Sequence, residues 1–356
     1  MKISAALVAG CGLASLAAPL ASAMPRLFNE STICETQFCE NRDDASLAMG
    51  KVKKYPYERI IASQPGYQWD DAGGYCGSWA TQRAVLANGA WISQQQVRDH
   101  TSDCGGHDEE ILSCNIEEAY KNLKISYDAF DYVNTPLPQH DAYFKWLKAH
   151  LAAGHPVAWM IMWSGQNYPI YNLKPPAGMY GHVEPVIGIA SNHPLNDTNV
   201  YDDDVVLHYT DGGTNTVHRK MSTLPCKWGG VGQPAVCQSG YTYGIGNPYG
   251  FGYAVKGFET GRSDAVPASL KVDPWESEPD TRSGQSPTTL KGTLTATELT
   301  SGKAYDIYRW DDVANVGKYT SEFKKKSFKA TSTSHTYADP LTIASDGTTY
   351  YSCVPQ

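Results

Sequence analysis

A cysteine set among glycines is the residue best suited to chemistry in this chain. Cys76 follows Gly73 and Gly74 and opens the segment CGSWATQRAVLA, which is rich in good helix formers. The unpaired N–H groups and partial positive charge of a helix N-terminus favour the reactive thiolate. The glycines let the backbone direct N–H groups at a developing oxyanion. The sequence therefore predicts a thiol nucleophile at Cys76, and the competing interpretation is a buried or disulfide-bonded structural cysteine.

The elements that must position this thiol are predicted to be helices first and strands afterwards. Ser93 followed by Gln96 is a capping-box pattern that opens one helix, and Asn115 followed by Glu118 opens another. A third helix with one apolar face is predicted to end at Gly154. Strands are then predicted from the runs VAWMIMW, HVEPVIGIA, DVVLHYT and GYAVKGF. This order predicts an α+β domain with a cleft between a helical lobe and a sheet lobe.

The ordered segments resemble the papain superfamily of cysteine peptidases, and most closely its bacteriocin leader-peptidase-like branch. The segment QWDDAGGYCGSWATQRAVLANGAWISQQQV has an upstream Gln, a Cys-Gly pair that opens a helix, and a Gly that ends it. The segments AAGHPVAWMIM, GHVEPVIGIA and VVLHYTDGG follow in the order of the family's strands. The resemblance covers residues 56–260 and implies a papain-like two-lobed domain, with a helical lobe and an antiparallel sheet lobe.

The resemblance also implies a catalytic triad. Cys76 becomes the nucleophile, His182 the general base and acid, and Asp211 the residue that orients the imidazole. The histidine takes the thiol proton and returns it to the leaving group, while the aspartate holds the tautomer and stabilises the imidazolium. Among the ten histidines, His155 and His208 are the next candidates for the base.

Three assignments stay open at this point. Asn215 and the acidic run Asp202 to Asp204 are rivals for the orienting group, and that run also fits a solvated loop or a calcium site. Gln68 is the glutamine expected to donate an oxyanion hydrogen bond, but it lies farther from the cysteine than in papain. An alignment on Trp79 and the alanine after it would place Ser78 at the nucleophile position instead.

The two ends of the chain differ from the middle. Residues 1–23 combine a charged start, an apolar run and an Ala-Ser-Ala end, which predicts a secretory signal peptide. Residues 24–55 are polar and irregular. A segment rich in Ser, Asp, Pro and Glu begins at residue 261, and short alternating strands follow it. Residues 264–356 therefore predict a small all-β sandwich-like domain of the immunoglobulin or fibronectin type.

Cysteine usage fits an oxidising compartment. The chain has nine cysteines, of which Cys11 would be removed with the signal peptide. Neighbouring positions predict the pairs Cys34 with Cys39, Cys104 with Cys114, and Cys226 with Cys237. Cys76 and Cys353 remain outside these pairs. A competing interpretation takes Cys104, His107 and Cys114 as three zinc ligands.

Charge and composition limit the partners. The net charge of -8 gives no electrostatic case for nucleic acid or an anionic membrane, and no later apolar run is long enough to span a bilayer. Glycosylation sequons at Asn29 and Asn196 fit export. We expect a secreted, extracellular glycoprotein with no cofactor and no resident metal, and the sequence leaves its oligomeric state open.

These observations predict a secreted thiol hydrolase that cleaves peptide or isopeptide amide bonds of a peptide or protein substrate through a thioester. A transglutaminase would use Cys, His and Asp in the same chain order, and amine incorporation separates the two. A noncatalytic binding protein or toxin on the same scaffold is the remaining alternative, since a fold does not establish a function. Reactivity of Cys76 separates that alternative from an enzyme.

Overall fold

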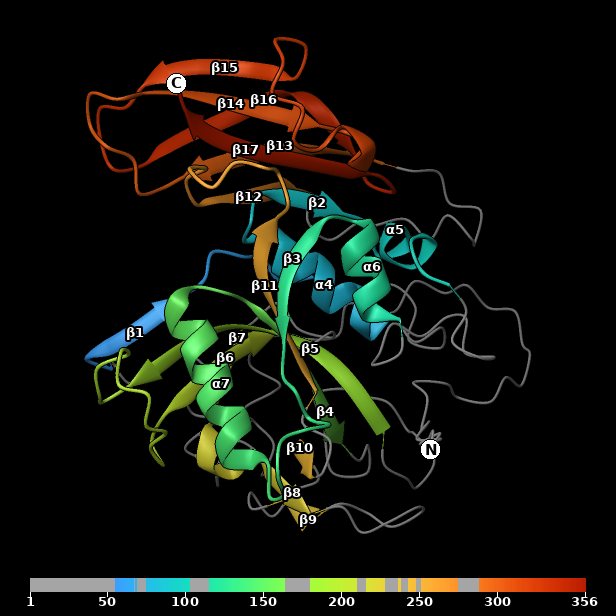
Figure 1. The fold of residues 1–356 in the computed structure, drawn as a ribbon, viewed down its shortest axis with the longest axis vertical. Coiled ribbons are helices and arrows are strands. Elements are labelled where there is room, and N and C mark those ends of the chain that lie inside the picture. The colour runs from blue at the N-terminus through green and yellow to red at the C-terminus, as the bar shows by residue number, and fades with distance from the viewer. Residues whose placement is uncertain are drawn as a thin grey trace.

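The computed structural model describes residues 55–66, 68, 75–102, 115–163, 180–209, 216–227, 236–237, 243–247, 251–274 and 288–356 (Figure 1). Several sequence predictions lie outside these residues. They are the signal peptide, the segment that follows it up to residue 54 with the sequon at Asn29, and the residues Asp211, Asn215, Cys34, Cys39, Cys104, His107 and Cys114.

The described residues form a mixed α and β fold with mostly antiparallel sheets. The helices are α4 (Cys76–Leu86), α5 (Gln94–Asp99), α6 (Ile116–Asn122) and α7 (His140–Ala153), with 3-10 helices η3 (Met221–Thr223) and η5 (Val313–Asn315). The larger sheet contains β1 (Tyr57–Ile60), β3 (Ile125–Ala129), β4 (Val157–Trp163), β5 (Tyr180–Ser191), β6 (Val205–Tyr209), β7 (Thr216–Lys220), β8 (Pro225–Lys227), β9 (Val236–Cys237), β10 (Tyr243–Asn247) and β11 (Gly252–Phe258). The two-lobed papain-like arrangement stays a prediction.

The main path of this sheet runs β7-β6-β5-β4-β10-β8-β9. β1 pairs with β5, and β11 pairs with both β4 and β3. All of these pairs are antiparallel except β8 with β10. β5, the strand that carries the predicted base, therefore lies between β4 and β6 and also pairs with β1.

The helix boundaries follow local signals in the sequence. The Ser93 side chain accepts a hydrogen bond from Gln96 N at 3.0 Å, so the predicted cap of α5 is confirmed. α6 begins directly after Asn115, but the Asn115 side chain makes no cap hydrogen bond. Its expected partner Glu118 accepts instead from the backbone N and side-chain hydroxyl of Ser102. The third predicted helix is α7, which ends at Gly154 in the left-handed conformation at φ 91°.

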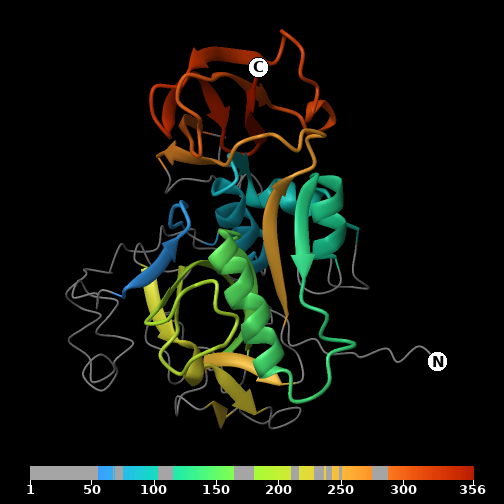
Figure 2. The same ribbon diagram turned by 60° about the vertical axis from the view of Figure 1, so that its left-hand side comes forward.

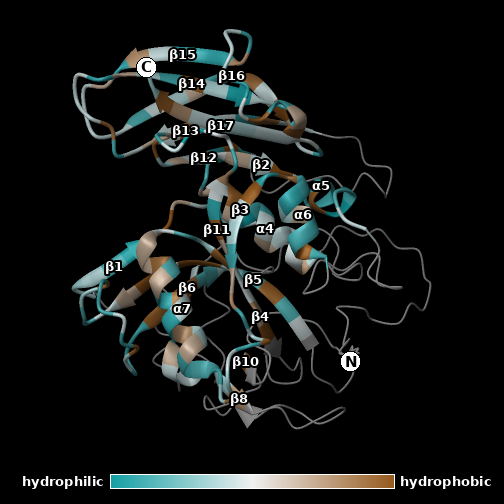
Figure 3. Ribbon diagram, in the orientation of Figure 1, coloured by the Kyte–Doolittle hydropathy of each residue, from teal (hydrophilic) through white to brown (hydrophobic). Residues whose placement is uncertain are grey.

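Helices α4 and α7 cover opposite faces of the larger sheet. The apolar side of α7, which includes Leu147 and Leu151, packs with Trp159, Val186 and Val206 of β4, β5 and β6. The alternate residues of β5 and β6 face α4, where Trp79 packs with Ile187, Val205, Leu207 and Tyr209. Figure 3 shows hydrophobic residues (brown) gathered on these central strands. The core thus has two layers, one on each side of β4 to β6.

The C-terminal strands form two further sheets. One contains β12 (Ala268–Asp273), β13 (Thr289–Ala296) and β16 (His335–Ala344). The other contains β14 (Ala304–Trp310), β15 (Lys324–Lys329) and β17 (Thr348–Pro355), and its fourth strand is β2 (Ala90–Ile92). Residues of both sheets share one apolar core, and Figure 2 shows these strands (orange to red) at one end of the molecule.

β2 joins the two predicted units, because it follows α4 in the chain yet pairs with β17. Trp91 of β2 is buried, and its indole N–H donates to Ser345 O at 3.2 Å. Leu86, the last residue of α4, and Trp91 both belong to the apolar core of the C-terminal strands. The helix that begins with Cys76 is therefore held at its C-terminal end by the unit predicted to be a separate domain.

Cys226 of β8 is disulfide-bonded, and Cys237 of β9 lies opposite it in the strand register. The predicted pairing of these two cysteines stays a prediction that agrees with that register.

Among the described residues, none of the helices is long and apolar enough to cross a membrane.

Candidate active site

Cys76 occupies the first position of α4. The first backbone bond of the helix runs from Trp79 N to Tyr75 O at 2.8 Å, so the N–H groups of Cys76, Gly77 and Ser78 precede it. These N–H groups carry the positive end of the helix dipole and favour an anion beside them. Cys76 retains its thiol and is 1% exposed. The position at the helix N-terminus agrees with the predicted nucleophile, whereas the burial of the side chain is also what the competing structural cysteine predicts.

Ser78, the rival from the alternative alignment, lies two residues inside the helix. It is fully buried, and its hydroxyl has no hydrogen-bond partner in the described structure. Because α4 begins at Cys76, the helix N-terminus acts most directly on the cysteine and not on the serine. The helix boundary therefore favours Cys76 over Ser78 as the nucleophile.

The N-terminus of α4 contacts the strands that carry the predicted base. Cys76 packs in one cluster with Ala80 of its own helix, Ala158 of β4 and Val183 of β5, and Met160 lies against the cluster. Val183 directly follows His182 in the sequence. The structure thus brings the cysteine against β5, one residue along from the predicted base.

His182 is buried, at 4% exposed, and it lies near the beginning of β5. It is paired with Ile161, which is two residues from the end of β4. Successive strand residues point to opposite faces, so His182 and Glu184 are directed away from the α4 face to which Val183 belongs. The contacts agree, because His182 Nε2 lies 4.0 Å from Glu184 Oε1.

Glu184 belongs to a buried polar chain that crosses three strands. Its Oε2 lies 2.9 Å from Nδ1 of His208 on β6, and Nε of Arg219 on β7 donates to His208 Nε2 at 3.0 Å. Since His208 Nε2 accepts this bond, its proton is on Nδ1, which donates to the glutamate. Glu184 and His208 are fully buried and Arg219 is nearly so. His208, an alternative base from the sequence, links an acid and a guanidinium in the structure.

Gln68, the predicted oxyanion donor, follows a segment that runs along α4. Trp79 Nε1 donates to Gly66 O at 3.1 Å, and Arg83 Nη1 donates to Pro65 O at 2.9 Å. Gln68 is half-buried and lies only two residues beyond Gly66, which is held beside the first turn of the helix. Its amide contact with a substrate stays a prediction.

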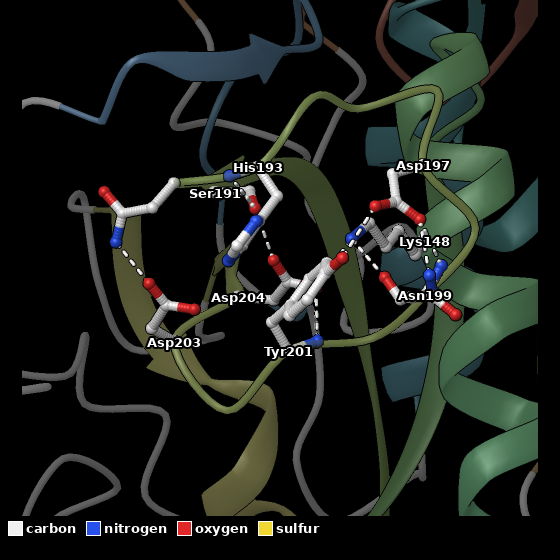
Figure 4. A network of polar contacts seen from close by, with 9 residues as sticks. Lys148, Ser191, His193, Asp197, Asn199, Tyr201, Asp203 and Asp204 are labelled. Carbon is white, nitrogen blue, oxygen red and sulfur yellow. Dashed lines mark hydrogen bonds and ion pairs between the residues drawn. The ribbon is translucent and has the colours of Figure 1, made fainter.

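The other residues considered from the sequence lie elsewhere. His155 is next to the end of α7, where its Nδ1 is 3.2 Å from His150 Nδ1. In the run Asp202 to Asp204, the last member forms a buried ion pair with Lys148 at 2.8 Å. Figure 4 shows that Ser191 and Tyr201 also donate to Asp204, so the ion pair with Lys148 ties the loop between β5 and β6 to α7. Among the described residues, no group of three or more His, Cys, Asp or Glu is placed to hold a metal ion.

Sequence reasoning missed Glu184. Its signal was present, since it is the one charged residue of the apolar run HVEPVIGIA apart from the predicted base. A carboxylate in a strand that is buried on both faces needs a partner. The partners come from β6 and β7, and their register cannot be read from the sequence.

No family model matches the chain, and no curated protein matches its sequence. Among solved structures, the chain is similar to the clostridial cysteine protease Cwp84 after propeptide cleavage. The identity is 12% and the TM-score 0.30, over 83% of this chain and 82% of that chain. This likeness is weak.

Proposed function

We propose that this protein is a secreted thiol hydrolase that cleaves peptide or isopeptide amide bonds through a Cys76 thioester. The observation that carries the proposal is the thiol of Cys76 at the first position of α4, packed against Val183 beside His182. A helix N-terminus that meets a histidine-bearing strand supplies both requirements of a thiol nucleophile, which are a stabilised thiolate and a nearby base.

The reaction follows from the roles of these groups. His182 is assigned to take the Cys76 proton. Because strand alternation places its side chain on the face opposite to Val183, this step requires the imidazole to turn toward the thiol at the beginning of β5. The thiolate attacks the amide carbon, and the N–H groups of the first turn of α4, with the amide of Gln68, stabilise the oxyanion. Asp211 is the residue that the resemblance assigns to orient the imidazole.

The C–N bond then breaks and His182 gives its proton to the leaving amine, which leaves a thioester on Cys76. A water molecule that His182 deprotonates attacks this thioester. The carboxylic acid product leaves and the proton returns to the cysteine, so the enzyme is unchanged.

The test is alkylation of the purified chain without residues 1–23 by iodoacetamide across pH 4 to 8, with peptide mapping of each modified cysteine. The variants are Cys76→Ala, His182→Ala and, as a matched control in the same helix turn, Ser78→Ala. We expect selective labelling of Cys76 that falls in H182A and persists in S78A. No labelling at Cys76, or its recovery in a disulfide, would leave the noncatalytic binding protein as the interpretation.

A peptide library digested by the same proteins tests hydrolysis itself. We expect cleavage by the wild type and by S78A but not by C76A. Addition of a fluorescent primary amine separates hydrolysis from acyl transfer, because a transglutaminase would attach the amine to the acyl product. Predominant amine incorporation over hydrolysis would replace the hydrolase assignment.

A further inference from the structure

The burial of the Glu184 carboxylate is unfavourable in free energy unless other groups compensate its charge. Glu184 is fully buried on a sheet face whose neighbouring positions hold Trp159, Ile161 and Val186. Removing a carboxylate from water costs several kcal/mol unless other groups compensate it. Here the compensation is the hydrogen bond from His208 to Oε2 and, through His208, the charge of Arg219. This arrangement leaves the second oxygen, Oε1, directed at His182.

We propose that Glu184 is a positioning residue for His182, with its carboxylate held by His208 and Arg219. The inference rests on the proposed function, because it assigns a part in the chemistry of the same base. Glu184 Oε1 is 4.0 Å from His182 Nε2, so an imidazolium formed when His182 accepts the thiol proton would face a carboxylate. An acid beside Nε2 also favours the tautomer that leaves Nδ1 for the thiol.

The groups around His182 on its face of the sheet support this assignment. On β4 the facing residues Ile161 and Trp159 are uncharged. On β6 and β7 the charged or titratable groups on this face are His208 and Arg219, which are both bound within the hydrogen-bonded network of Glu184. The other titratable residues of these strands, Tyr209, His218 and Lys220, alternate to the opposite face. On α7 the buried Lys148 is bound to Asp204. Among the described residues, Glu184 is thus the acid directed at the imidazole.

If the hydrogen-bonded network of Glu184, His208 and Arg219 had a purely structural role, substitution of Glu184 would have a different effect. Such a network would fasten β5, β6 and β7 together, and its loss would lower stability without changing the ionisation of His182. The isosteric variant Glu184→Gln separates the two, because its amide oxygen still accepts from His208 while the charge beside His182 is removed.

The experiment is an NMR titration of the His182 ring protons in the wild type and in E184Q, together with kcat/KM on a cleaved peptide. We expect the titration midpoint of His182 to fall by about 1 pH unit or more in E184Q. We expect kcat/KM to fall by about 10- to 100-fold, within the range that acid–base catalysis supplies. An unchanged midpoint together with a lower melting temperature would overturn the proposal.

A double variant covers failure of E184Q to fold. In Cys76→Ala combined with Asp211→Asn, neither a thiolate nor Asp211 can stabilise the imidazolium, so His182 should still titrate above about pH 6.5, the ordinary value for a histidine. A midpoint below that value would overturn the proposal. If the peptide is not cleaved at all while the E184Q midpoint still falls, the proposed function fails and the Glu184 assignment to His182 stands.

Discussion

The side chain of Gln64 pairs with the backbone of Val272 in both directions. Gln64 Nε2 donates to Val272 O at 3.1 Å, and Val272 N donates to Gln64 Oε1 at 2.6 Å. Gln64 belongs to the segment along α4, and Val272 belongs to β12 of the C-terminal strands. One buried amide thus fastens the approach to the candidate active site to the other unit.

Replacement of Gln64 tests this link. In Gln64→Leu the buried N–H and C=O of Val272 lose these partners, so we expect the free energy of unfolding to fall by about 2 to 3 kcal/mol. Urea denaturation of the full chain measures it. An exposed change on the same chain, Lys326→Ala, is the control and should leave the midpoint in place. Equal midpoints for Q64L and wild type would show that the pairing contributes nothing.

Cys353 should remain unmodified under conditions in which iodoacetamide alkylates Cys76. Burial, with a smaller contribution from Asp306, raises the pKa of the Cys353 thiol to about 12. Its thiolate is therefore a minute fraction of the population at pH 8, and thiolate is the reactive form. Peptide mapping after brief alkylation of the folded protein should find Cys353 unmodified, and Cys353→Ala should not change the rate at Cys76. Comparable labelling of both cysteines would contradict this.

The buried ion pair between Lys148 and Asp204 should be sensitive to the loss of one partner. Lys148→Met leaves the Asp204 carboxylate in the interior without its cation, which costs about 3 to 5 kcal/mol. The double variant Lys148→Met with Asp204→Asn removes the charge as well and should recover part of that loss. Thermal unfolding of the two single variants and the double variant measures the coupling. If the losses of stability in the two single variants add up to the loss in the double variant, Lys148 and Asp204 are not energetically coupled.

Acid should weaken the region where α7 meets β4. Burial lowers the pKa of both His150 and His155, and their mutual repulsion contributes for His155. The unfolded chain therefore binds protons before the folded one does, so stability is present above about pH 6.5 and falls as the pH drops below it. His155→Gln should flatten this fall when unfolding is measured between pH 7 and 5. An unchanged slope would assign the acid sensitivity to other groups.

Much of the fold could be predicted from local patterns. The cap at Ser93, the start of α4 at Cys76, the end of α7 at Gly154 and the strand that contains His182 are all found where the residues indicate them. Each depends on residues a few positions apart, and for that reason the sequence displays it. The thiol at a helix N-terminus belongs to the same class of local signal.

The rest depends on register between distant segments. β2 is three residues long and has no strand pattern of its own, so its pairing with β17 could not be foreseen. The chain from Glu184 to Arg219 also depends on which residues of β5, β6 and β7 stand opposite one another. The resemblance pointed to Asp211 for the orienting part, whereas the described contact of His182 is with a residue of its own strand.

The pairing of β2 with β17 has a consequence for the order of events during synthesis. β2 ends at Ile92, and the strand that completes its edge runs from Thr348 to Pro355. A contact between such distant residues forms late, because the entropy cost of closing a long loop must be met before the contact can stabilise the chain. The helix with Cys76 is followed directly by β2, so its C-terminal end is secured only after residue 355 has left the ribosome. In a chain that is still being synthesised, α4 therefore has no contact with β17, and the helix that begins with Cys76 gains its full set of packing partners only at the end of synthesis.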